Sequence, residues 1–119
     1  MRDIAIVAYH QSTCVSHAGA TNEVELIMPQ LQAVFDQTGL HNAQDVGFVC
    51  SGSCDYLQGA AFAFVSGVDA LGAVPPIKES HVEMDAAWAL YEAVLKIRMG
   101  HADSALIYGF GKSSPGELP

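Results

Sequence analysis

The residues best suited to chemistry lie between positions 79 and 85, in the run Glu-Ser-His-Val-Glu-Met-Asp. Glu83 could serve as a general acid or base, because its surroundings can tune the pKa of a carboxyl group toward the working pH. His81 could pair with Glu83 or with Asp85 as a proton shuttle, since imidazole titrates near neutral pH and alternate residues of a strand point to one face. We therefore predict a catalytic pair, Glu83 and His81, at the start of the apolar helix that follows.

The same run has a purely structural interpretation. Ser80 and Glu83 have the spacing of a capping box, in which both side chains satisfy the first backbone donors of a helix. His81 would then be a polar residue at an interface. Both interpretations are compatible with the sequence.

A second candidate site is the small-residue loop Ser51-Gly52-Ser53, which precedes a predicted helix. Backbone N–H groups at such a position can hold the phosphate or pantetheine part of a cofactor. The spacing is not Gly-x-Gly-x-x-Gly, so it does not indicate a dinucleotide site. The run Gly111-Lys112-Ser113 ends like a phosphate-binding loop, but it lacks the required earlier glycine and Pro115 follows, so we reject that assignment.

Cys50 and Cys54 flank this loop and could form a redox pair or half of a zinc site. A structural zinc site needs four ligands, and only Cys14 and His17 remain to complete one, so we predict no metal site. Cys50 ends a predicted buried strand and is more simply a small apolar residue, whereas Cys54 near a helix start could be a reactive thiol.

Alternating apolar runs provide the elements that would position these residues. The helix over residues 85–99 is apolar on most faces, which predicts that it is covered on most sides. Other helices are expected over residues 21–38, with Thr21 as N-cap, and 56–71, and strands over residues 3–8, 46–50, 77–82 (an edge strand) and 103–110. The order β-α-β-α-β-α-β predicts the α/β class, with a mostly parallel sheet and helices on both faces. After the last strand the sheet would be incomplete, so we expect residues 1–119 to be part of a longer chain.

Composition excludes several function classes. Five basic residues against thirteen acidic ones give a net charge of −8, which disfavours nucleic acid and anionic lipid as partners. Charged residues make up 15% of the chain, below the roughly 25% of an ordinary domain, so we expect it to bury surface against another chain or domain. The sequence contains no 18-residue apolar stretch and no signal peptide, and its three cysteines suggest reduced thiols. We predict a cytoplasmic protein without membrane insertion.

Several motifs resemble the N-terminal half of the thiolase family. They are Gly-His-Ala-Asp-Ser-Ala-Leu at residues 100–106 and Gly-Phe-Gly-Lys-Ser-Ser at residues 109–114. The runs at residues 50–57 and 79–85 resemble the lipid-transfer-protein branch, which is related to the sterol-carrier-protein-type thiolases. The resemblance implies a thiolase-like half-domain over residues 1–119 and an acyl-CoA-processing activity, as an acyltransferase or a carbon–carbon-cleaving enzyme of lipid and steroid breakdown.

In thiolases a nucleophilic cysteine enters the helix, and the matching position here is Glu83. A carboxylate cannot replace a thiolate in forming a thioester, so the resemblance implies retro-aldol or another carbon–carbon cleavage that needs only an acid or base. It further implies a coenzyme A thioester as substrate without a tightly bound cofactor. The expected partners are a second copy, paired through the strand at residues 77–82, and a small acyl-CoA-binding protein.

Two other functions are compatible with the sequence. The chain could be a non-catalytic thiolase-fold scaffold, or a lipid-transfer or interaction subunit, that kept the fold and lost the chemistry. A stand-alone flavodoxin-like binding module would require a finished sheet. As a half-domain, residues 1–119 alone are expected to be inactive.

Overall fold

The computed structural model describes residues 2–16, 19–58, 64–72 and 78–111 of the chain. In chain order its elements are helix α1 (Glu23–Thr38), a 3-10 turn (Ala43–Asp45), strand β1 (Phe48–Gly52), helices α2 (Asp55–Gln58) and α3 (Phe64–Leu71), strand β2 (Glu79–Val82), helix α4 (Ala86–Arg98) and strand β3 (Ala105–Gly109). The helix predicted over residues 56–71 thus corresponds to α2 and α3, and residues 59–63 lie outside the described part.

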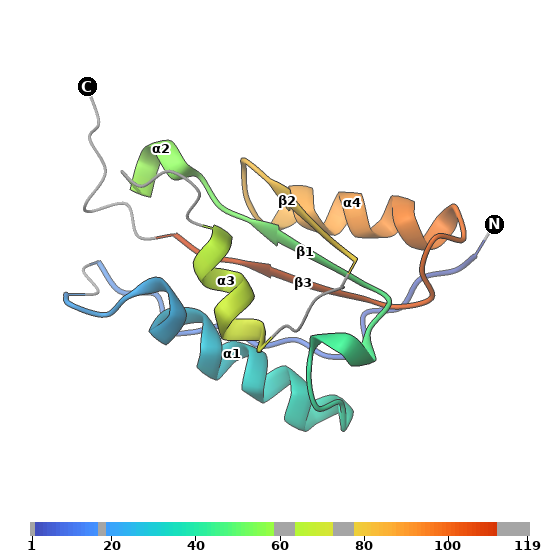
Figure 1. Ribbon diagram of the computed structural model, residues 1–119, viewed down its shortest axis with the longest axis horizontal. Helices are drawn as coiled ribbons and strands as arrows, with labels where there is room; N and C mark the ends of the chain where they lie inside the picture. Colours follow the sequence, from blue (N-terminus) through green and yellow to red (C-terminus); the bar gives the residue numbers. More distant parts are fainter. Residues whose placement is uncertain (1, 17–18, 59–63, 73–77, 112–119) are drawn as a thin grey trace.

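The three strands form one parallel sheet in the order β2-β1-β3. In the centre, Cys50 is in register with Ser80 of β2 and with Ile107 of β3. Parallel strands need crossover connections: α2 and α3 lie in the connection between the neighbours β1 and β2, and α4 lies in the connection that leads from β2 past β1 to β3. Figure 1 shows α4 on one side of the sheet and α1 and α3 on the other. The predicted α/β class, with a parallel sheet, helices on both faces and an edge strand at β2, is confirmed.

Alternation along β1 divides the core into two layers. Phe48 and Cys50 pack toward α4, where the buried residues are Ala89, Ala93 and Ala102. Val49 points to the other face and joins a cluster with α1, α3 and β3. The buried members of that cluster are Ile27, Leu31, Phe35, Ala43, Val49, Ala70, Leu71 and Leu106. The period of two along a strand therefore explains both layers.

Helix α4 approaches the sheet through its small residues. Ala89 and Ala93 are fully buried, and a Cβ at Gly52 would overlap with the backbone of Asp85 just before the helix. A Cβ at Gly109 would lie 2.6 Å from the Ala86 Cβ, so both strands beneath the helix carry glycine at the contact. Small residues on both sides let the helix axis lie close to the sheet.

Several large apolar residues in and around α4 are exposed. Exposed side chains recur at helical spacing from the turn before α4 to its C-cap, namely Met84, Trp88, Tyr91, Leu95 and Met99. We call these five residues the outer stripe of α4. The prediction that the helix is covered on most sides is therefore wrong for the part of the chain described. The reason is that the helix packs through alanine, which leaves its bulky residues on the opposite face.

The packing of Gly52 predicts the effect of adding one methyl group. We expect Gly52→Ala to lower the free energy of unfolding by about 1–3 kcal/mol, because the new Cβ must push α4 away from β1. Urea titration followed by circular dichroism measures this change. Gly111→Ala is the control, since among the described residues, apart from its chain neighbours, no atom lies within 4 Å of a Cβ there. Equal stability of the two variants would contradict the close packing of α4.

The strand predicted over residues 3–8 is not formed. Residues 2–15 have no regular secondary structure, and Ile6 and Val7 are exposed. Just after this run, the side chain of Gln37 in α1 accepts from the Tyr9 backbone N–H at 3.3 Å and donates to the Tyr9 carbonyl at 3.2 Å. A β-branched run forms a strand only where another strand satisfies its backbone, and in the described residues the sheet of β1, β2 and β3 does not include residues 3–8.

The ends of α1 follow standard capping chemistry, with one correction. Asn22, and not the predicted Thr21, is the N-cap, and its side chain accepts from the Glu25 N–H. The helix continues past Pro29 and ends at Gly39, whose φ of 75° is the left-handed conformation that favours glycine.

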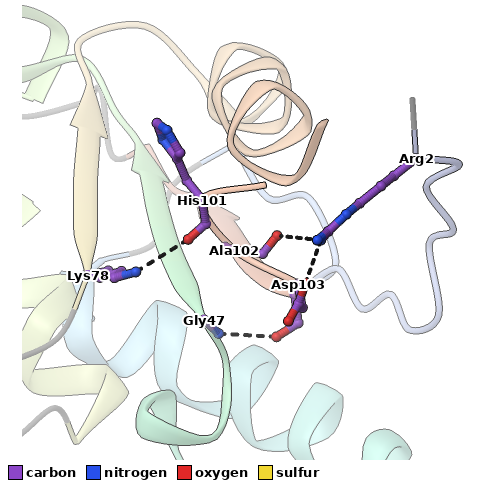
Figure 2. A network of polar contacts seen from close by, with 7 residues as sticks. Arg2, Gly47, Lys78, His101, Ala102 and Asp103 are labelled. Atoms are coloured by element: carbon purple, nitrogen blue, oxygen red, sulfur yellow. Dashed lines mark hydrogen bonds and ion pairs between the residues drawn. The ribbon is translucent and has the colours of Figure 1, made fainter. Parts of the chain in front are cut away.

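The amino ends of the strands are joined by a polar network (Figure 2). Gly47, just before β1, donates its N–H to the Ser104 hydroxyl at 3.1 Å, and Lys78, just before β2, donates to the His101 carbonyl at 3.3 Å. Arg2 forms an ion pair with Asp103 and donates to the Ala102 carbonyl. These contacts tie the N-terminal segment and all three strands together at one edge of the sheet.

Candidate functional site

The carboxyl ends of the strands carry a row of polar side chains. Ser51 of β1 is in register with His81 of β2 and with Tyr108 of β3. Residues in register on neighbouring strands point to the same face, so the three side chains form a line across the sheet. In open parallel sheets this edge is where ligands bind.

A continuous polar chain leads outward from this row. The Ser51 hydroxyl lies 2.9 Å from His81 Nδ1, and His81 Nε2 lies 3.4 Å from a carboxylate oxygen of Glu83. The other Glu83 oxygen accepts the backbone N–H of Asp55 at 2.5 Å. His81 is 14% exposed and Glu83 is 52% exposed, so the chain runs from the interior of the sheet to solvent. The predicted contact between His81 and Glu83 is present.

The capping-box interpretation of Ser80 and Glu83 is wrong. The N-cap of α4 is Asp85, whose side chain accepts from the backbone N–H groups of Ala87 and Trp88 at 3.0 and 3.2 Å. Ser80 lies within β2, and Glu83 lies in the turn between β2 and the cap. Because Asp85 satisfies the helix donors, the Glu83 carboxylate remains available to His81 and to Asp55.

The cap makes a simple prediction about stability. We expect Asp85→Ala to lower the free energy of unfolding by about 1 kcal/mol, because the Ala87 and Trp88 donors lose their acceptor. Asp85→Asn should retain most of that stability, since an amide oxygen caps equally well. Thermal unfolding of the two variants tests this, and an Asp85→Ala variant as stable as the parent would contradict the assignment.

Tyr108 is a site residue that the sequence reasoning missed. Burial raises its pKa to about 12, an effect that the Ser51 hydroxyl partly offsets and the Glu79 charge increases. Gly67 of α3 makes room for the phenol, since a Cβ there would overlap with the Tyr108 hydroxyl. The sequence could not single out Tyr108, because its place at the carboxyl end of a strand, facing a glycine, is recognised only once the strand register is known.

The raised pKa of Tyr108 predicts a late step in the ultraviolet titration of the four tyrosines. Its phenolate should form near pH 12, about two pH units above its ordinary value of 10.0. A raised pKa stabilises the fold below pH 10, and this stabilisation is lost as pH rises from about 10 to 12. Tyr108→Phe should abolish the late step and Tyr9→Phe, at an exposed position, should not. A late step that survives Tyr108→Phe would contradict the assignment.

The loop predicted to bind a cofactor is largely inside the protein. Ser51 and Gly52 belong to β1, and both serine side chains are buried, at 4% exposed for Ser51 and 1% for Ser53. The Ser53 N–H donates to the Val82 carbonyl at 3.3 Å, which joins the ends of β1 and β2. The Ser53 hydroxyl has no hydrogen-bond partner among the described residues. Cofactor binding by Ser51, Gly52 and Ser53 stays a prediction.

The cysteines do not form a cluster. Cys50 is fully buried, and burial raises the pKa of its thiol to about 11, with the Glu92 charge adding to the shift and the Ser80 side chain opposing it. Its expected role as a small apolar core residue is confirmed. Cys14 is exposed and Cys54 is partly exposed, and both are free thiols. His17 lies outside the described residues.

A different set of residues has the composition of a metal site. Ligand atoms of Asp55, His81 and Glu83 all lie within 4.8 Å of one another. They come from the start of α2, from β2 and from the turn after β2. The sequence did not indicate this set, because Asp55 and His81 are brought together only by the pairing of β1 with β2.

Comparison of the chain with protein-family models, with curated proteins and with solved structures finds no match. In the part of the chain that the structure describes, no helix combines the length and apolarity that a membrane span requires. What the chain does is therefore inferred from the geometry at the carboxyl edge of the sheet.

Proposed function

We propose that the chain is the N-terminal half of a thiolase-like, cytoplasmic acyl-CoA-processing enzyme that cleaves a carbon–carbon bond in lipid or steroid breakdown. The observation that supports this most is the polar chain from Ser51 through His81 to Glu83. It ends in a half-exposed carboxylate at the carboxyl edge of a parallel sheet, at the position where the sequence resemblance puts the reactive group. A carboxylate paired with a histidine provides acid–base chemistry without a nucleophilic cysteine.

The proposed step is the retro-aldol cleavage of a β-hydroxyacyl thioester. Glu83 accepts the proton of the β-hydroxyl group, the Cα–Cβ bond breaks, and its electron pair passes into the thioester enolate as the carbonyl product forms. The proton held by Glu83 then returns to the enolate carbon directly or through His81. Ser51 holds the His81 ring, and Asp55 holds the Glu83 carboxylate through its backbone N–H. The pair of His81 and Glu83 is therefore fixed at both ends, by the Ser51 hydroxyl on one side and by the Asp55 N–H on the other.

Partners follow from the same proposal. The outer side of β2 has no strand beside it among the described residues, so a second copy could extend the sheet there. A homodimer paired through this edge, a coenzyme A thioester as substrate and a small acyl-CoA-binding partner protein form part of the proposal.

The test of the proposed chemistry is Glu83→Gln in the complete protein. We expect retro-aldol turnover of a β-hydroxyacyl-CoA to fall about a hundred-fold or more, because an amide cannot accept the proton. The amide oxygen can still accept the Asp55 N–H, so the melting temperature should change little.

Glu79→Gln is the matched control. It removes a carboxylate charge at the exposed start of β2, two residues before His81, whereas Glu83 lies in the turn after β2. Turnover should be unaffected. Full activity in Glu83→Gln, or equal losses in the two variants, would contradict a role for Glu83 as the base.

A second candidate is a non-catalytic scaffold or interaction subunit. The observation that favours it is the outer stripe of α4, where five large apolar side chains line one face of a helix. A stripe of this kind is typical of a surface that contacts another protein. If Glu83→Gln and His81→Ala both leave the activity of the complete protein unchanged, this function is preferred.

A further inference from the structure

We propose that Asp55, His81 and Glu83 form a binding site for one divalent transition-metal cation, Zn²⁺ or Mn²⁺. The ligand set is one imidazole nitrogen and two carboxylate oxygens, drawn from three separate segments that the parallel sheet brings together. Three protein ligands with open positions toward solvent are typical of cation sites that also bind water or a substrate.

The three ligand atoms must move closer together to bind a cation. The three ligand atoms lie within 4.8 Å of one another. Bonds of roughly 2.0–2.2 Å in tetrahedral geometry place ligand atoms about 3.3–3.6 Å apart. His81 Nε2 and the Glu83 oxygen, at 3.4 Å, already have this spacing, and a pair at the 4.8 Å limit would have to close by about 1 Å. Glu83 is 52% exposed and Asp55 is partly exposed, which leaves room for the carboxylates to turn.

The position of His81 supports the same site. Its Nδ1 atom is fixed by the buried Ser51 hydroxyl at 2.9 Å, which aims Nε2 at Glu83. Metal-binding histidines commonly donate their second ring N–H to a fixed acceptor in this way, which sets the tautomer and the ring orientation. With a cation bound, Nδ1–H would donate to the Ser51 oxygen, and the lone pair of Nε2 would face the metal.

The charges at this edge also favour a cation. The carboxylates of Asp55 and Glu83 lie close enough to repel each other, and a divalent ion between them removes that repulsion. The imidazole nitrogen favours Zn²⁺ over Ca²⁺, which prefers oxygen ligands alone, and the two carboxylates also suit Mn²⁺.

The experiment is a titration of the metal-free full chain with Mn²⁺, followed by the electron paramagnetic resonance signal of free Mn²⁺. We expect one bound Mn²⁺ per chain, displaced by Zn²⁺ and not by an equal concentration of Ca²⁺. His81→Ala and Glu83→Gln should each weaken binding at least ten-fold, and Ser51→Ala about ten-fold to a hundred-fold through loss of the ring orientation. Circular dichroism confirms that each variant is folded.

The control variants remove one histidine and one glutamate side chain outside the proposed cation site. His101→Ala deletes an exposed imidazole whose residue contacts Lys78 only through its backbone carbonyl (Figure 2). Glu79→Gln deletes a carboxylate at the other end of β2. Both should retain Mn²⁺ binding. Absence of Mn²⁺ binding, or binding that survives His81→Ala, would overturn the site.

The cation site does not depend on the proposed cleavage reaction, because binding is measured without substrate. A protein that binds no Mn²⁺ but loses turnover in Glu83→Gln would remove the cation site and leave the proposed function standing. A protein that binds Mn²⁺ through these residues but retains turnover in Glu83→Gln would remove the proposed function and leave the cation site standing.

Discussion

The close approach of α4 to β1 and β3 is the constraint on which the rest of the structure depends. Gly52 and Gly109 lie against Asp85 and Ala86 with no space for a side chain. The start of α4 is therefore held directly over the end of β1, and Asp85 caps the helix there. This leaves only a short turn after β2, and Glu83 in that turn is carried to the Asp55 amide. The position of the candidate base follows from the helix packing.

The amino and carboxyl ends of the strands carry two different polar networks. At the amino edge, Arg2 and Lys78 bind carbonyl and carboxylate groups and hold segments together (Figure 2). At the carboxyl edge, the row of Tyr108, Ser51 and His81 leads outward to a carboxylate. In a parallel sheet all strands end at the same edge, so polar residues far apart in the sequence meet there. The network at the carboxyl edge runs from the buried Ser51 to a half-exposed carboxylate, whereas Arg2 and Asp103 at the amino edge are both exposed, and for this reason the carboxyl edge is the better candidate for chemistry.

Local patterns were sufficient to predict the fold class and part of the site. Alternating apolar runs predicted the parallel sheet, and the spacing of two between His81 and Glu83 predicted their contact. The strand expected over residues 3–8 failed because apolar content does not indicate whether another strand is available. Asp55 and Tyr108 could not be predicted, because their places depend on the strand register. Local patterns also could not predict which face of α4 packs on the sheet. Alanine and tryptophan both count as apolar, but alanine lets the helix lie closer to the strands.

The central claim is that His81 is held between Ser51 and Glu83, and its most direct test is long-range ¹H–¹⁵N correlation spectroscopy of the histidine rings. In the metal-free protein we expect His81 as a single tautomer with the proton on Nε2, because Nδ1 accepts from the Ser51 hydroxyl and Nε2–H donates to Glu83. Its ring signals should change in Glu83→Gln and not in Glu79→Gln. A His81 ring that averages between tautomers, and whose signals do not change in Glu83→Gln, would contradict the account.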